Sequence, residues 1–129
     1  MTRLAIIFSL LFVTPACAET VLYCQDELAT GIGKENGSWK TGDFKLKRYT
    51  VKFDEKKMTL LLDNERFSCA PKWALYPDRI RCETEMFADF HFVFNKKTMR
   101  YSIYRMFATA WIDDGNDTTM MSHGTCQKF

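Results

Sequence analysis

The seven residues Ile80-Arg81-Cys82-Glu83-Thr84-Glu85-Met86 carry the clearest structural signal in the chain. Apolar or small side chains occupy every second position, and charged side chains occupy the positions between them. Successive side chains of a strand point to opposite faces, so this alternation predicts a strand with one buried and one solvated face. Such strands are typical of antiparallel sheets. The stretch therefore predicts an all-β fold.

The same period of two continues on both sides of this stretch. It extends through residues 90–107 towards the C-terminus and through residues 44–69 in the other direction. Together these segments predict a small antiparallel meander of about seven to nine short strands. A closed barrel is favoured because closure removes exposed sheet edges, and a β-sandwich is the alternative.

Turn signals divide the strands. Residues 53–58 and 94–99 both place Phe before Asp or Asn, then lysines, then Met, which predicts two similar β-hairpin turns. Near the start, Gly31, Gly33 and the Asn36-Gly37 pair predict turns after a short first strand at residues 21–25, and residues 40–43 predict another. A change of phase at Lys47-Arg48 predicts a β-bulge.

The first 18 residues predict a cleavable signal peptide. Arg3 precedes a ten-residue apolar stretch, and small residues lead to a cut between Ala18 and Glu19. The stretch is too short to span a bilayer, so no transmembrane segment is expected after cleavage. Residues 19–129 then form one small β domain, periplasmic or secreted, and the compact leader indicates a bacterial envelope. The alternative is a lipoprotein anchored at Cys17.

Cleavage leaves four cysteines, an even number, as expected of an exported disulfide protein. We predict the pairs Cys24–Cys126 and Cys69–Cys82. The first would join the first and last strands, which are neighbours in a closed meander, and the second would tie one hairpin. No C-x-x-C spacing is present, which argues against a zinc or redox site.

Charge and composition limit the partners. The leader removes one basic residue, so the net charge falls from +2 to +1. Basic residues gather between Lys34 and Lys57, but acids dilute them, and we expect no nucleic acid partner. The apolar stripes are expected to form the chain's own core, which favours a monomer.

Candidate catalytic residues are few. An enzyme would use His91 or His123 with a carboxylate from Asp113, Asp114 or Asp117. Ser122 and His123 should point to opposite faces of a strand, so they are not expected to form a dyad. The acidic turn at residues 113–117 lacks the calcium-loop pattern. We therefore expect no catalytic activity, no metal and no cofactor.

The loop from Ala70 to Arg79 is the best candidate for a partner-binding surface. Two prolines and the flanking cysteines would restrict it, which lowers the entropy lost on binding. Trp and Tyr are enriched at binding hot spots. The candidate contact residues are Lys72, Trp73, Leu75 and Tyr76.

Two short resemblances to known families accompany these patterns. Gly37-Ser38-Trp39 resembles the Gly-x-Trp signature of lipocalins, which implies a Trp that closes one barrel end. Val21-Leu22-Tyr23-Cys24 and the terminal Cys126 resemble the periplasmic inhibitors of c-type lysozyme, which implies a small barrel. The central Ser-Gly-x-x-Tyr motif of those inhibitors has no counterpart, so no inhibitory residue is carried over.

The sequence thus favours a non-catalytic binding module of the bacterial envelope. Its partner would be an envelope protein or a small apolar ligand inside the barrel. The alternatives are a periplasmic inhibitor-like protein and a small envelope enzyme that uses His91 or His123.

Overall fold

The computed structural model describes residues 19–70, 75–84, 90–106 and 118–129. These residues form nine strands and no helix. The described part of the chain therefore has no helix that could cross a membrane. The strands are β1 (Thr20–Glu35), β2 (Ser38–Asp43), β3 (Arg48–Asp54), β4 (Thr59–Leu62), β5 (Glu65–Cys69), β6 (Arg79–Thr84), β7 (Phe90–Asn95), β8 (Arg100–Met106) and β9 (Thr118–Lys128). The predicted leader and its cut lie outside the described residues.

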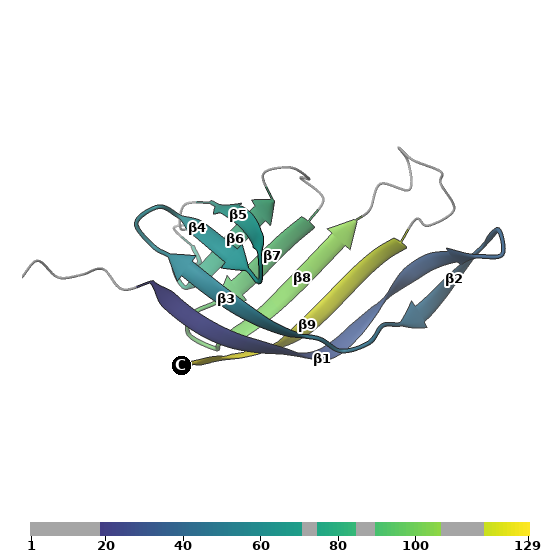
Figure 1. Cartoon of the computed structure of the whole chain (residues 1–129), viewed down its shortest axis with the longest axis horizontal. Helices are drawn as coiled ribbons and strands as arrows, with labels where there is room; N and C mark the ends of the chain where they lie inside the picture. Colours follow the sequence, from purple (N-terminus) through teal and green to yellow (C-terminus); the bar gives the residue numbers. More distant parts are fainter. Residues whose placement is uncertain (1–18, 71–74, 85–89, 107–117) are drawn as a thin grey trace, which may run out of the picture.

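Eight of the strands close into an antiparallel barrel (Figure 1). From β3 to β9 each strand pairs with the next along the chain, and β1 closes the ring by pairing with both β3 and β9. The ninth strand, β2, pairs only with the second half of β1 and extends beyond the ring. The predicted barrel and strand number are confirmed, and the sandwich is not adopted.

The first strand is much longer than predicted. β1 runs for 16 residues, and Gly31 and Gly33 lie inside it rather than in turns. A Cβ atom at Gly31 would lie 2.0 Å from the carbonyl oxygen of Thr119 on β9, so glycine here permits a close approach of two strands. The turn lies at Asn36-Gly37, where both residues have positive φ, as a two-residue hairpin turn requires. Residues 40–43 belong to β2.

The predicted bulge at Lys47-Arg48 is wrong, because residues 44–47 belong to no strand and β3 begins at Arg48. A bulge does occur on β1. The register of β1 against β9 shifts between Asp26 and Leu28, so the bulge is on β1. Asp26 is buried, Glu27 and Leu28 are both exposed, and Ala29 is buried again. The bulge thus marks the point where β1 changes from pairing with β3 to pairing with β2.

The two predicted lysine-rich turns are confirmed. The Asp54 carboxylate accepts hydrogen bonds from the backbone N–H groups of Lys56 and Lys57. The Asn95 side chain does the same for the two residues at 97 and 98. The turns also meet, because Lys96 forms an ion pair with Glu55.

Both predicted disulfides are present, each between directly opposed residues of neighbouring strands. Cys24 on β1 is bonded to Cys126 on β9, with Cα atoms 4.0 Å apart. Cys69 on β5 is bonded to Cys82 on β6, with Cα atoms 3.9 Å apart. Two disulfides are compatible with an oxidising, extracellular or periplasmic location.

The inward side chains of the barrel strands form one apolar core. Its fully buried members come from strands on all sides of the ring, and include Val51, Phe67, Cys82, Phe92 and Ile103. Trp39 lies outside this core. It is on β2 and about half exposed, so it does not close a barrel end as the lipocalin resemblance implied. The chain's own side chains therefore occupy the middle of the barrel.

Candidate functional site

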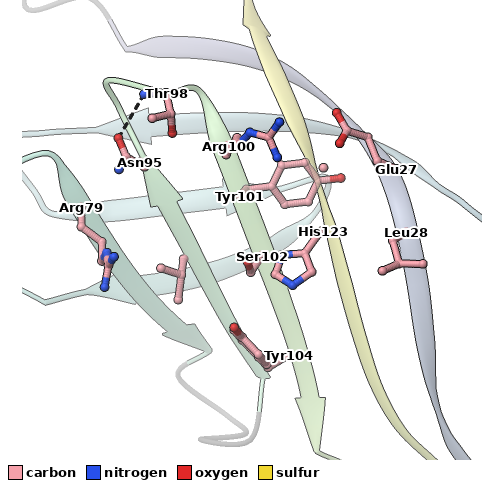
Figure 2. Close-up of a pocket in the computed structure, with 12 residues that line it drawn as sticks. Glu27, Leu28, Arg79, Asn95, Thr98, Arg100, Tyr101, Ser102, Tyr104 and His123 are labelled. Carbon is pink, nitrogen blue, oxygen red and sulfur yellow. Dashed lines mark hydrogen bonds between the residues drawn. The ribbon is translucent and has the colours of Figure 1, made fainter.

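A polar concavity that contains two arginines lies on the outside of the barrel (Figure 2). This outer hollow has a volume of about 640 Å³ and is lined mainly by outward-facing residues of β6, β7, β8, β9 and β1, together with the buried Tyr101. The strand register arranges them in rows. Arg79, Asn95 and Arg100 form one row across β6, β7 and β8. Val93, Ser102, His123 and Leu28 form the next, across β7, β8, β9 and β1.

Arg79 and Arg100 give one end of the outer hollow its charge. Asn95 lies between them as the direct partner of both, so their Cα atoms are two strand spacings apart, about 10 Å. Among the described residues, no carboxylate lies within 4 Å of either guanidinium. The Arg79 guanidinium lies over the ring of Tyr76 at 4.7 Å, which extends this surface to the loop before β6.

That loop is the predicted partner-binding loop. Leu75 is 85 % exposed and Tyr76 is 52 % exposed, so the described half of the loop presents apolar surface to solvent. The cysteines on either side are bonded, as predicted. Lys72 and Trp73 lie outside the described residues, and their candidate role stays a prediction.

A serine and a histidine meet at the centre of the outer hollow. Ser102 Oγ lies 2.6 Å from His123 Nδ1, across the β8–β9 pairing. This pair was not predicted from the sequence, because the register between β8 and β9 brings the two residues together. Ser122 is fully buried while His123 is exposed, so these neighbours lie on opposite faces of β9, as predicted.

The carboxylate on the opposite side of the hollow does not complete a triad with this pair. Glu27 Oε1 accepts a hydrogen bond from Thr125 Oγ1 at 3.1 Å. Asp113, Asp114 and Asp117, the carboxylates considered for an enzyme, lie outside the described residues. His91 is on β7, with Nδ1 at 3.7 Å from Glu83 Oε2, and this nitrogen makes no hydrogen bond.

A second hollow, of about 670 Å³, lies on the outer face of β9, β1 and β3. Arg48 is accompanied there by Asp63 and Glu27. The Asp63 carboxylate accepts a hydrogen bond from the backbone N–H of Thr50, 3.0 Å away. This hollow is therefore lined by one arginine and two carboxylates, whereas the outer hollow is lined by two arginines and one carboxylate.

A buried carboxyl group organises the inside of the barrel beneath the outer hollow. The Tyr101 hydroxyl donates a hydrogen bond to Asp26 Oδ1 at 2.6 Å, and the backbone N–H of Lys47 donates to Oδ2 at 2.9 Å. The Tyr49 hydroxyl lies 3.5 Å from the same Oδ2. The burial of Asp26 could have been predicted from strand alternation, because Asp26 continues the inward series of Leu22 and Cys24.

The surroundings of Tyr49 and Tyr101 disfavour ionisation of their hydroxyl groups. Burial, and next the negative charge of Asp26, raise the pKa of Tyr49 to about 12. Burial and the hydrogen bond to Asp26 raise the pKa of Tyr101 above its usual value. Both hydroxyl groups therefore stay protonated, and available as hydrogen-bond donors, over the physiological pH range.

Gly124 makes this interior contact feasible. It lies on β9 as the direct partner of Asp26 on one side and of Tyr101 on the other. A Cβ atom there would lie 2.7 Å from the Tyr101 hydroxyl oxygen and 2.0 Å from the carbonyl oxygen of Gln25. The absence of a side chain lets the Tyr101 hydroxyl cross over β9 to reach β1.

Among the described residues, no three metal-ligating side chains come together. The arrangement of the outer hollow instead suits recognition of an anionic group by arginines, with hydroxyl and amide groups beside them. Comparison of the chain with protein-family models, with curated proteins and with solved structures yields no match.

Proposed function

We propose that this protein is a non-catalytic binding module of the cell envelope, periplasmic or secreted, and that it binds an acidic segment of a protein partner. The binding surface would be the outer hollow together with Leu75 and Tyr76. The observation that carries the proposal is the arginine pair. Arg79 and Arg100 flank Asn95 across three strands, with no carboxylate within 4 Å among the described residues.

The chemistry of the arginine pair selects the partner. A guanidinium matches a carboxylate in a two-pronged hydrogen bond, and two guanidiniums about 10 Å apart suit two acidic side chains of one extended segment. Arg81, two residues along the outward face of β6, adds a third positive charge. Glu27 on the far side of the hollow would repel carboxylates, which restricts them to the arginine end.

The neighbouring loop supports a protein as the partner. Arginine and tyrosine are enriched at binding hot spots, and Tyr76 is held next to Arg79. An exposed leucine precedes it. The packed core argues against the other candidate, a small apolar ligand in the middle of the barrel.

Site-directed photocrosslinking tests the proposal. A photoreactive phenylalanine at position 104, on the outer face of β8 in the hollow, should form a discrete protein adduct in the producing cell. Replacing both arginines, Arg79→Ser with Arg100→Ser, should reduce the adduct at least about thirtyfold, which corresponds to a hot-spot loss of 2 kcal/mol or more.

The barrel offers a matched control on its other wall. Lys52 and Arg66 flank Leu61 across β3, β4 and β5 in the same way that the arginines flank Asn95. The double variant Lys52→Ser with Arg66→Ser removes the same charge and should leave the adduct intact. Equal loss in both double variants, or no adduct from a folded protein, would contradict the proposal.

A further inference from the structure

One strand of the sheet, β2, has a partner on a single side. Each of the other described strands pairs on both edges, whereas β2 pairs with β1 alone and extends beyond the ring (Figure 1). All six residues of β2 are exposed, and no described strand pairs with its outer edge. An open edge presents unpaired backbone N–H and C=O groups, which can pair with a strand of another chain.

The register between β1 and β2 identifies the backbone groups at this edge. The Phe44 N–H, one residue beyond β2, donates a hydrogen bond to the Ala29 carbonyl oxygen, 2.9 Å away. Residues of an antiparallel pair direct their backbone groups alternately towards and away from the partner strand. Since this register has no shift, the N–H and C=O groups of Trp39, Thr41 and Asp43 point away from β1.

The features that usually protect an open edge are missing from β2. The strand contains no proline, and its pairing with β1 has no bulge. A charged lysine can also guard an edge. The lysine of β2, Lys40, forms an ion pair with Glu35 of the same hairpin instead, with Nζ 2.8 Å from Oε2. The outer edge of β2 is therefore open to pairing.

A second copy of the chain can satisfy this edge by symmetry. Two β2 strands can pair antiparallel about a twofold axis, with each Thr41 opposite the other and Trp39 opposite Asp43 of the second copy. The outward backbone groups then form about six hydrogen bonds, two at each of three residue pairs. A register centred on Lys40 would oppose two lysines, which is destabilising. A register centred on Gly42 would leave Trp39 beyond the end of the second β2 strand.

The side chains of the register centred on Thr41 are complementary. The Lys34 ammonium group lies 5.8 Å from the centroid of the Trp39 ring. The Asp43 carboxylate forms no ion pair with another described residue, and it would lie opposite Trp39 of the second copy, close to that ammonium group. Trp39 is 49 % exposed, and its indole N–H is a hydrogen-bond donor that suits a carboxylate. The symmetry makes this contact twice.

We propose that two copies of this chain associate through their β2 strands into one continuous sheet, with Thr41 at the twofold axis. Pairing uses the one free edge of each described sheet, so the assembly closes at two copies. The monomer predicted from the sequence rested on the apolar stripes, which do form the core, whereas this contact uses the backbone. The β2 edge is separate from the outer hollow, so the dimer does not depend on the proposed function.

Analytical ultracentrifugation of the protein purified from its producing cell tests the association. The average mass should rise from that of one chain to that of two between about 1 µM and 1 mM. Thr41→Pro removes an N–H group that β1 does not use, and it should leave a monomer over this whole range. Thr41→Ala keeps the N–H group and should still dimerise, with an affinity at most about fivefold weaker.

Disulfide cross-linking with oxidised glutathione tests the register. Thr41→Cys should join two chains, because the substituted positions face each other across the axis. Lys40→Cys is the matched control, since its two Cα atoms would lie farther apart than the roughly 7 Å that a disulfide bridges. The parent chain should not cross-link under the same conditions.

Circular dichroism checks the folding of each variant, and the cross-linking decides the question if Thr41→Pro does not fold. A monomer at every concentration would overturn the proposal and leave the β2 edge to a strand of a different protein. An undiminished dimer in folded Thr41→Pro, or equal cross-linking of Thr41→Cys and Lys40→Cys, would overturn it as well.

Discussion

The Tyr101 hydroxyl on β8 donates a 2.6 Å hydrogen bond to the Asp26 carboxyl group on β1, across β9 and inside the barrel. The two residues are 75 positions apart in the chain. Asp26 also lies at the bulge where β1 exchanges β3 for β2. One buried hydrogen bond therefore connects β8 to the point on β1 where the pairing of β1 changes from β3 to β2.

Removal of this hydroxyl should destabilise the barrel. Tyr101→Phe leaves Asp26 Oδ1 buried without its donor, and loss of a hydrogen bond to a charged group costs about 1.5–3 kcal/mol. Urea denaturation should show this decrease in the free energy of unfolding. Tyr104→Phe, on the outer face of the same strand, should change it by no more than about 0.5 kcal/mol. Equal losses of stability in the two variants would show that the hydrogen bond between Tyr101 and Asp26 does not stabilise the fold.

Alkaline pH should destabilise the fold through the same cluster. The pKa of Tyr49 is about 12 in the folded chain, against 10.0 for a free tyrosine, so the unfolded chain releases its proton first. The stabilisation is complete below pH 10 and is lost as the pH rises towards 12, by up to about 1.4 kcal/mol per pH unit. This loss of stability can be measured as a decrease in the midpoint of urea denaturation between pH 9 and pH 11.

Tyr49→Phe separates this effect from the general titration of other groups. The variant lacks the ionisable hydroxyl, so its stability should fall less steeply above pH 10 than that of the parent chain. A parallel decline in both proteins would show that Tyr49 is not responsible.

Strand period, turns and disulfides were accessible from the sequence because they depend on local pattern and parity. Asp54 and Asn95 fold their turns through hydrogen bonds to nearby backbone, which residue type alone predicts. The length of β1 was not accessible. Gly31 was interpreted as a turn residue, whereas it permits contact with β9, a strand almost 90 positions later. Such a requirement becomes visible only when the partner is known.

The candidate site follows the same division. Exposure of Leu75 and Tyr76 agrees with their assignment to a stapled loop, but the arginine pair was missed. Arg79 and Arg100 are far apart in sequence, and only the registers of two hairpins bring them to either side of Asn95. The contact between Ser102 and His123 depends on register in the same way. Long-range register therefore creates the site.

The two disulfides should contribute unequally to stability. Cys24–Cys126 joins residues 102 positions apart, and Cys69–Cys82 joins residues 13 positions apart. Restriction of the unfolded chain grows with loop length, giving about 4.7 kcal/mol for a loop of 100 residues and about 3 kcal/mol for one of 15. The two double alanine variants, compared by urea denaturation, should show the larger loss for the pair at 24 and 126. Equal losses, or the reverse order, would contradict this account.

Gly124 should be among the least replaceable positions of the barrel. A methyl group there would meet the Gln25 carbonyl oxygen at 2.0 Å and the Tyr101 hydroxyl at 2.7 Å. Since the first of these atoms is backbone, β1 and β9 would have to separate, and the hydroxyl would be pushed off Asp26.

Overpacking alone costs about 1–3 kcal/mol, and the lost hydrogen bond adds about 1.5–3 kcal/mol. Gly124→Ala should therefore lower the free energy of unfolding by at least about 2.5 kcal/mol. Gly42→Ala is the matched control, because a Cβ atom at that strand position has no neighbour within 4 Å. The control should be neutral or slightly stabilising, by up to about 1 kcal/mol, since alanine restricts the unfolded chain. If Gly124→Ala and Gly42→Ala unfold alike, the close packing of β1, β9 and the Tyr101 hydroxyl is not what requires glycine at position 124.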